Sequence, residues 1–309
     1  MLLALKVDVD TLRGTREGVP RLVDLFARHG VGATFLFSLG PDHTGRAIRR
    51  AFRPGFASKV RRTSVVRHYG VRTLMYGTLL PGPDIGVRAA DTMRATRDAG
   101  FETGVHCWDH VRWQDGVASA DAAWTLREMR LACERYAAVF GEPPRVHGAA
   151  GWQMNVHALR LTQRLGFDYC SDGRGTHPHL PFWNAEPIRC PQFPTTLPTL
   201  DELIGLDGVD ESNVAERLLA RTAVPSADGH VFTLHAELEG LRLLPVLEQL
   251  VVGWKAQGWM PTSMRRLYES VEPLALPRCA VGAGSVPGRS GILFVQQGPF
   301  PGAAMPEAA

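Results

Sequence analysis

Cysteine is scarce in this sequence, and its five positions are scattered along the chain: Cys107, Cys133, Cys170, Cys190 and Cys279. The count is odd and no C-x-x-C pair occurs, which argues against a disulfide framework and against a zinc ribbon. No run of about 18 apolar residues is present, so no membrane-spanning helix is expected. The cysteine pattern therefore favours a reducing compartment, and residues 1–5 are too short for the apolar part of a signal peptide.

Net charge is also small. Lysine and arginine exceed aspartate and glutamate by only +3, which is too little to indicate a nucleic-acid partner. Apolar residues make up 45% of the 309 residues and charged residues 21%, so the chain can bury a full core. No G-x-G-x-x-G follows the first apolar segment, which weakens the case for a dinucleotide-binding fold.

Predicted strands and helices alternate about seven times over residues 1–272. Strands are expected at 2–10, 31–38, 101–106, 145–150, 167–172 and 230–235, and helices at 17–29, 86–99, 119–140, 154–165, 211–223 and 242–257. Such alternation favours a parallel sheet covered by helices. The count favours a distorted (β/α)7-type barrel over a Rossmann sheet, and residues 1–272 are predicted to form this domain.

An insertion at residues 41–84 interrupts the alternation. It holds nine basic residues, and no acidic residue lies between Asp42 and Asp84. Apolar side chains are interleaved with the basic ones, and such a segment suits a membrane surface or a phosphate-bearing ligand. The predicted contacts are Arg49, Arg50, Arg61 and Arg62. The alternative is a solvated helical hairpin with ordinary surface arginines.

Residues 273–309 form a second departure from the pattern. They are rich in proline, glycine and alanine and carry little charge. This composition predicts a largely disordered tail beyond the barrel.

Two carboxylates end the first predicted strand. Asp8 and Asp10 are two residues apart, so the pleat directs both side chains to the same face, which Lys6 shares. In a parallel barrel the carboxyl ends of the strands line the active site. One carboxylate could bind a metal while the other acts as a general base. A helix cap or turn is the alternative.

Two histidines follow a later strand in the order His106-Cys107-Trp108-Asp109-His110. Residues four apart fall on one face of a helical turn, so both imidazoles could bind one ion. The glutamate of H-E-x-x-H is absent, and Asp8 is available as the base. Two histidines and one carboxylate suit zinc, cobalt, manganese or nickel. Two unrelated surface histidines are the alternative.

Further candidates lie at the ends of two more strands. His235 ends an apolar strand and is placed to act as a general acid, although a lone histidine there is more often a core residue. Asp172 could hold the imidazole of His235 in the useful tautomer, and Glu237 could orient it or contact substrate. Arg174 could bind a phosphate or carboxylate. Asp-Gly is a common turn, so Asp172 and Arg174 could instead be turn residues.

These motifs together resemble a known superfamily. Val7-Asp8-Val9-Asp10, H-x-x-x-H and Leu234-His235 are similar to the NodB-type polysaccharide deacetylases over residues 1–270. The resemblance implies a distorted barrel with one divalent metal ion. It also implies that Asp8 is the general base, that Asp10, His106 and His110 are the metal ligands, and that His235 is the general acid.

Within this superfamily, the sequence most specifically resembles the ArnD family of 4-deoxy-4-formamido-L-arabinose-phosphoundecaprenol deformylases. The motifs that carry it are Asp8-Val9-Asp10-Thr11, Arg13 to Pro20, Ser38 to Asp42, His106 to His110, Ala149 to Trp152, Ser171 to Gly175, Thr196 to Glu202 and His235-Ala236-Glu237. The family implies loss of formate from an undecaprenyl-phosphate-linked amino sugar at the cytoplasmic face of the inner membrane. It further implies a role in lipid A modification and polymyxin resistance. The candidate substrate contacts are Arg13, Arg174, Trp108, Trp152 and Glu237.

One superfamily motif is altered. The usual R-x-P-[FY], whose arginine tethers the base, reads Ala149-Ala150-Gly151-Trp152 here. Lys6 and Arg174 are the candidates to replace that arginine. Two other functions stay open at this point. One is an N-deacetylase of another amino sugar or polysaccharide, and the other is a catalytically inactive barrel that only binds sugar or lipid.

Overall fold

The computed structural model describes residues 1–47 and 70–300. Its main sheet contains β1 (Leu2–Val9), β2 (Thr34–Ser38), β3 (Glu102–Cys107), β4 (Val146–His147), β5 (Tyr169–Cys170), β8 (His230–His235) and β9 (Met260–Thr262). The helices are α1 (Val19–His29), α4 (Val71–Met75), α5 (Ile85–Arg88), α6 (Ala90–Asp98), α7 (His110–Gly116), α8 (Ala122–Phe140), α9 (Val156–Arg164), α10 (Leu200–Leu203), α11 (Val214–Arg221), α12 (Leu244–Ala256) and α13 (Met264–Tyr268).

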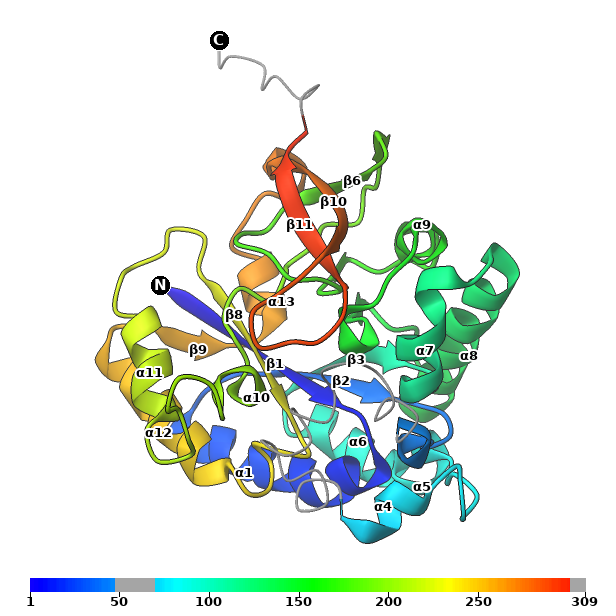
Figure 1. The fold of residues 1–309 in the computed structure, drawn as a ribbon, viewed down its shortest axis with the longest axis horizontal. Coiled ribbons are helices and arrows are strands. Elements are labelled where there is room, and N and C mark those ends of the chain that lie inside the picture. The colour runs from blue at the N-terminus through cyan, green and yellow to red at the C-terminus, as the bar shows by residue number, and fades with distance from the viewer. Residues whose placement is uncertain (48–69, 301–309) are drawn as a thin grey trace.

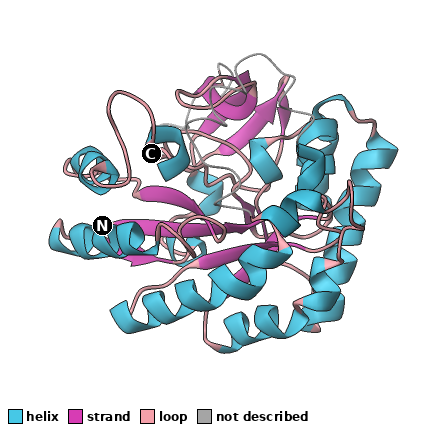
Figure 2. Ribbon diagram, turned by 60° about the horizontal axis from the view of Figure 1, so that its bottom comes forward, coloured by secondary structure: helices cyan, strands magenta, loops and turns pink. Residues whose placement is uncertain are grey.

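The main sheet is parallel, with the order β5-β4-β3-β2-β1-β8 and with β9 beside the start of β1. The strands lie together in the interior and the longer helices surround them (Figures 1 and 2). Strand and helix alternate through most of the chain, as predicted. The distorted (β/α) barrel expected from that alternation is confirmed.

Helix ends follow the signals in the sequence. Gly30, with φ +59°, ends α1, and Gly141, with φ +79°, ends α8. Glycine adopts this left-handed conformation without the steric penalty of a side chain. At the other end of α8, the side chain of Asp121 accepts a hydrogen bond from the backbone N–H of Trp124. These caps fix where the helices cross the outside of the sheet.

The pleat of β1 divides the interior of the molecule into two sides. Leu3, Leu5, Val7 and Val9 belong to the large apolar core that includes residues of α1 and α12. Ala4 faces the opposite way and packs with Leu36, Val146, Tyr169 and Phe193 inside the barrel. Lys6 and Asp8 share the face of Ala4. The side chains of Lys6 and Asp8 therefore lie between this apolar cluster and the carboxyl ends of the strands.

An extended segment bridges the two edge strands of the sheet. On one side, Phe193 N–H donates to the carbonyl of Cys170 in β5. On the other, the N–H groups of Thr196 and Leu197 donate to the carbonyl of Val231 in β8. The segment from Phe193 to Leu197 thus helps to close the barrel between β5 and β8.

A second, smaller sheet corrects the prediction for the tail. It has the order β11-β10-β6-β7, formed by β6 (Leu180–Trp183), β7 (Glu186–Pro187), β10 (Arg278–Gly284) and β11 (Leu293–Pro299). Disorder was therefore the wrong prediction for residues 273–300, because Cys279, Val281, Leu293 and Phe294 are buried. Val281 and Phe294 pack in one apolar cluster with barrel residues such as Cys170. Residues 301–309 lie outside the described part, and the domain boundary at 272 stays a prediction.

The central part of the basic insertion, residues 48–69, also lies outside the described residues, and with it Arg49, Arg50, Arg61 and Arg62. Its two flanks are described, and α4 belongs to the second. Among the described residues, no helix combines the length and the apolar character that crossing a membrane requires.

Candidate metal centre and active site

Asp10, His106 and His110 converge at the carboxyl end of the sheet. Nε2 of His106 lies 3.3 Å from Oδ1 of Asp10, and Nε2 of His110 lies 3.4 Å from Oδ2. One ligand atom from each of the three residues lies within 4.8 Å of the others. This spacing allows all three to bind a single ion.

The two histidines meet for a different reason from the one predicted. His106 is in β3, the chain then bends, and His110 is the first residue of α7. The imidazoles stack with their centroids 5.4 Å apart. Asp109 caps α7 by accepting from the N–H of Arg112, and its other oxygen lies 2.6 Å from Nδ1 of His43. A strand end followed by a capped helix, rather than one helical turn, brings the imidazoles together.

The polar groups around this triad suit a divalent cation. Nδ1 of His106 donates to the carbonyl of Gly148 at 2.7 Å, which directs Nε2 toward Asp10. Oδ1 of Asp10 is buried and has no hydrogen-bond partner among the described residues. Burial alone would raise the pKa of Asp10, but His110, His106 and His235 outweigh it and lower that pKa. An ionised carboxylate and two oriented imidazoles are appropriate ligands for zinc and similar metals.

Asp8 lies beside the triad and is paired with Lys6. Nζ of Lys6 is 3.3 Å from Oδ2 of Asp8 and donates to the carbonyl of Ser171 at 3.0 Å. Both side chains are buried, and Oδ1 of Asp8 has no hydrogen-bond partner among the described residues. Lys6 therefore occupies the position of a tether for Asp8, one of the two candidates named from the sequence.

Glu237 supports the backbone that carries Asp10. Its Oε1 accepts from the N–H groups of Asp10 and Thr11 and from the hydroxyl of Thr11. A Cβ on Gly14 would lie 2.0 Å from this oxygen, so a larger residue there would displace the carboxylate of Glu237. Burial, with a contribution from the charge of Asp10, raises the pKa of Glu237 well above its usual range. Glu237 thus holds the backbone of the loop after β1 in place.

His235 comes from β8, the strand next to β1, and its charge is one of the influences that lower the pKa of Asp10. It ends β8 and is the register partner of Asp8 in β1, so the proposed acid and base come from adjacent strands. Its backbone N–H donates to Oε2 of Glu239 at 2.7 Å. Its Nδ1 has no hydrogen-bond partner among the described residues. The imidazole meets the indole of Trp152 edge to face, with centroids 6.4 Å apart.

Glu239 gives the site a pH-dependent stability. Burial, partly offset by the hydrogen bond from His235, raises its pKa from 4.5 to about 8. The folded protein therefore holds this proton where the unfolded chain releases it, so its contribution to stability declines as pH rises from about 4.5 to 8. We expect Glu239→Gln to melt close to the parent protein at pH 5 and about 5 °C or more above it at pH 9. Thermal unfolding across this pH range measures the difference.

The prediction for Glu239 is tested by whether the difference in melting temperature between variant and parent grows as the pH rises. Glu237 also has a raised pKa, but it is present in both proteins and cancels in the comparison. Equal melting temperatures of parent and variant at pH 9 would contradict a buried, protonated Glu239. Glu269→Gln is the matched control, because Glu269 is exposed on the surface.

Trp152 forms a wall of the site and is held in an unusual conformation. Its φ is +51°, in the left-handed region that side chains other than glycine seldom adopt. Its Nε1 donates to Oγ1 of Thr195 at 3.1 Å. Three cations lie over its ring, at 5.4 Å for Lys6, 5.0 Å for Arg174 and 4.5 Å for Arg289. Such a conformation persists where the surroundings enforce it, and it is commonly found at functional sites.

Asp172 does not hold His235, and that prediction is wrong. Its Oδ1 accepts from Nδ1 of His147 at 2.6 Å and from the N–H of Ala149, and its Oδ2 accepts from Gln192. The neighbouring residues Cys170 and Cys190 lie in the apolar cluster outside the barrel wall. The pleat therefore places Asp172 on the side of the sheet that faces away from His235.

Arg174 does not lie open to a substrate phosphate, which also corrects a prediction. It forms a buried ion pair with Glu202 and donates to the carbonyl of Leu197 at 3.1 Å. With its donors turned to Glu202 and Leu197, it stabilises the loop before α10. It also does not tether Asp8, which leaves Lys6 for that role.

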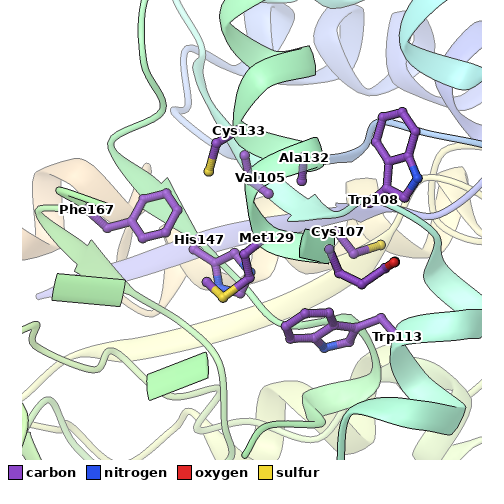
Figure 3. A pocket seen from close by; sticks show the side chains of 10 residues that line it. Val105, Cys107, Trp108, Trp113, Met129, Ala132, Cys133, His147 and Phe167 are labelled. Atoms are coloured by element: carbon purple, nitrogen blue, oxygen red, sulfur yellow. The ribbon is translucent and has the colours of Figure 1, made fainter. Parts of the chain in front are cut away.

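The remaining substrate candidates lie at the edges of the site. Trp108 packs against Gly40 and beneath the guanidinium of Arg135, 5.3 Å from its ring. It lines a cavity between β3, β4 and α8 whose other walls include Trp113, Met129, His147 and Phe167 (Figure 3). Arg13 pairs with Glu17 at 3.1 Å. Substrate contact by either stays a prediction.

Comparison with known proteins identifies the family. No family model matches the chain. A protein from Shewanella sediminis (strain HAW-EB3), described as a probable 4-deoxy-4-formamido-L-arabinose-phosphoundecaprenol deformylase ArnD, is 39% identical over 251 residues, which are 81% of this chain and 80% of that protein. The chain belongs to the ArnD family. A second ArnD protein with the same description, from Wigglesworthia glossinidia brevipalpis, is 29% identical over 287 residues, covering 92% of this chain and 98% of that protein.

A solved structure supports the fold of this ArnD family chain. A polysaccharide deacetylase structure from Mycobacterium smegmatis superposes with a TM-score of 0.63 and 17% identity, over 92% of this chain and 94% of that one. At this identity the likeness concerns the fold alone. The family resemblance read from the motifs and the predicted barrel are both confirmed.

Three residues of the site in this ArnD family chain were not predicted from the sequence. Asp109 follows a strand and precedes an apolar helical pattern, so the N-cap rule could have identified it. Glu239 lies two residues beyond Glu237 in a turn, and no periodic signal distinguishes it. Arg289 is in the segment predicted to be disordered, and no local pattern marks it.

Proposed function

We propose that this protein hydrolyses the N-formyl group of undecaprenyl-phosphate-linked 4-deoxy-4-formamido-L-arabinose, with one divalent metal ion held by Asp10, His106 and His110. The observation that carries the proposal is the convergence of this triad beside Asp8 in a chain 39% identical to an ArnD protein. Zinc, cobalt, manganese and nickel all suit the ligand set. A metal bound there would act as a Lewis acid on the amide carbonyl and activate water.

The residues of the chain divide the proton transfers between them. Asp8 takes a proton from the attacking water, and Lys6 keeps its carboxylate in place through the 3.3 Å contact. His235 gives a proton to the departing amine. Because Asp8 and His235 are register partners in neighbouring parallel strands, the base and the acid start from adjacent positions at the same end of the sheet. Trp152 then forms the wall beside His235.

Release of the acyl group tests this function directly. Undecaprenyl-phosphate-linked 4-formamido and 4-acetamido sugars are supplied to the purified protein, and formate and acetate are measured with and without a chelator. We expect formate release that the chelator abolishes and added metal restores. Release of acetate instead would move the substrate to another amino sugar and keep the mechanism. If metal-loaded protein released neither formate nor acetate, the result would favour a catalytically inactive barrel that only binds sugar or lipid.

We further propose that the protein works at the cytoplasmic face of the inner membrane as a peripheral protein. A lipid-linked substrate requires access to the bilayer surface, and the basic insertion supplies positive charge for anionic lipid. The four arginines Arg49, Arg50, Arg61 and Arg62 lie outside the described residues, so their part in binding rests on the sequence.

Vesicle binding measures the contribution of these arginines. We expect the fourfold change to serine to weaken co-sedimentation with vesicles containing anionic lipid by about tenfold or more, because each basic residue near such a surface contributes about 1 kcal/mol. The matched control replaces four exposed helical arginines with serine, namely Arg127, Arg130, Arg217 and Arg221. Equal weakening in both variants would mean that only total charge matters, and unchanged binding of the first would contradict the proposal.

A further inference from the structure

The C-terminal hairpin returns to the active site. β10 and β11 are antiparallel, and the loop that connects them extends toward the barrel (Figure 1). Arg289 belongs to this loop. Nε of Arg289 donates to Oε1 of Glu202 at 2.8 Å, and its guanidinium lies 4.5 Å from the centroid of the Trp152 ring. Trp152 in turn meets the imidazole of His235. Arg289, far from β1 in the sequence, thus contacts a tryptophan that lines the active site.

The loop is shaped to reach this position. Gly288 has φ +81°, and a Cβ placed on it would lie 2.4 Å from the backbone carbonyl of Glu202. Both the conformation and the close approach therefore require glycine. The hairpin is anchored again at Ile292, whose carbonyl accepts from Nε2 of Gln153 at 2.6 Å. Gln153 directly follows Trp152, so the hairpin contacts the strained segment twice.

The contacts of Arg289 bear on how Trp152 is held. Lys6 and Arg174 reach the indole from the strands and loops of the barrel, whereas Arg289 is supplied by the hairpin. Glu202 joins them, because it accepts from both Arg174 and Arg289 and also from the N–H of Thr199. The attraction between a cation and an indole is comparable in size with the cost of one strained backbone conformation.

We propose that Arg289 is a positioning residue for catalysis, and that the C-terminal hairpin completes the active site by clamping Trp152 against His235. This deepens the proposed function and rests on it, because His235 is the group whose placement matters. Arg289 acts through the indole and does not itself touch the reacting atoms. Removing it leaves Trp152 free to relax from its left-handed conformation, and the imidazole of His235 then loses its neighbour.

Fluorine NMR of protein labelled with 5-fluorotryptophan tests the clamp without reference to activity. The chain has seven tryptophans, and Trp152→Phe assigns the resonance of Trp152 by its disappearance. We expect Arg289→Ala to shift and broaden that resonance, and to lower kcat by about tenfold while changing KM little. Arg289→Lys keeps a cation near the ring and should restore part of both signals. Arg278→Ala is the control, because Arg278 is an exposed arginine of the same hairpin.

A pair of glycine variants separates placement from charge. Gly288→Ala keeps Arg289 but drives the loop away from Glu202, and it should reproduce the effects of Arg289→Ala. Gly291→Ala has the same left-handed strain, at φ +87°, but open space around its Cβ, and should leave Trp152 unchanged. If Arg289→Ala does not fold, the two glycine variants still test whether the position of Arg289 affects Trp152.

Two results would overturn the proposal. One is an unchanged Trp152 resonance in both Arg289→Ala and Gly288→Ala. The other is a shifted resonance with the parent kcat, which would make the clamp structural only. Absence of deformylase activity in the parent protein would instead count against the proposed function, and the resonances would still report whether the clamp exists.

Discussion

Replacing Asp8 with asparagine is expected to lower turnover of an N-formyl amino sugar by about a thousandfold, the range typical of losing a general base. Asparagine keeps the shape of the side chain but cannot accept a proton from water at neutral pH. Asp10, His106 and His110 remain, so the variant should still bind one equivalent of metal. Steady-state formate release and metal analysis on the same sample measure the two properties.

The matched variant for Asp8→Asn is Asp10→Asn, two residues along the same strand end. Asp10 approaches both histidines, at 3.3 and 3.4 Å, so its loss should reduce the metal content as well as turnover. Excess metal in the assay should then recover part of the activity of Asp10→Asn and none of that of Asp8→Asn. If both variants lost metal equally, Asp8 would be a ligand rather than a base.

The parts of the fold that follow from local periodicity could be predicted. Apolar strands ending in polar residues, such as β1 and β8, placed Asp8 and His235 at one edge of the sheet. Helix ends at Gly30 and Gly141 followed from glycine after an apolar stripe. The C-terminal hairpin could not be predicted in this way. Its stability comes from long-range burial of residues such as Phe294 against the barrel, which composition does not reveal.

The candidate site was likewise predictable only in part. Residue type and spacing singled out Asp10, His106 and His110, because few side chains bind metals and strand ends converge in a parallel barrel. The partners of Asp172 and Arg174 were mispredicted because each has several possible neighbours at a strand end. Which neighbour it meets depends on the face of the pleat and on segments distant in the sequence. Asp172 meets His147 and Arg174 meets Glu202.

Lys6 is expected to be essential because it is a buried cation beside a buried carboxylate. We expect Lys6→Met to lower the free energy of unfolding by about 3–5 kcal/mol, the usual result of removing one partner of a buried ion pair. Methionine matches the length of lysine but can neither pair with Asp8 nor donate to the carbonyl of Ser171. Turnover at a temperature where the variant is folded should also fall, because the carboxylate of Asp8 is then no longer held.

Lys255→Met is the control for the substitution itself, since Lys255 is exposed and donates to the carbonyl of His29. Lys6→Arg, which keeps the charge, should retain more turnover than Lys6→Met. The decisive comparison is the double variant Lys6→Met with Asp8→Asn. If Lys6 serves to balance the charge of Asp8, removing both should destabilise the protein less than the sum of the single changes. Additive losses would show that Lys6 acts mainly through Ser171 and the Trp152 ring, and the tether for the base would then have to be sought elsewhere.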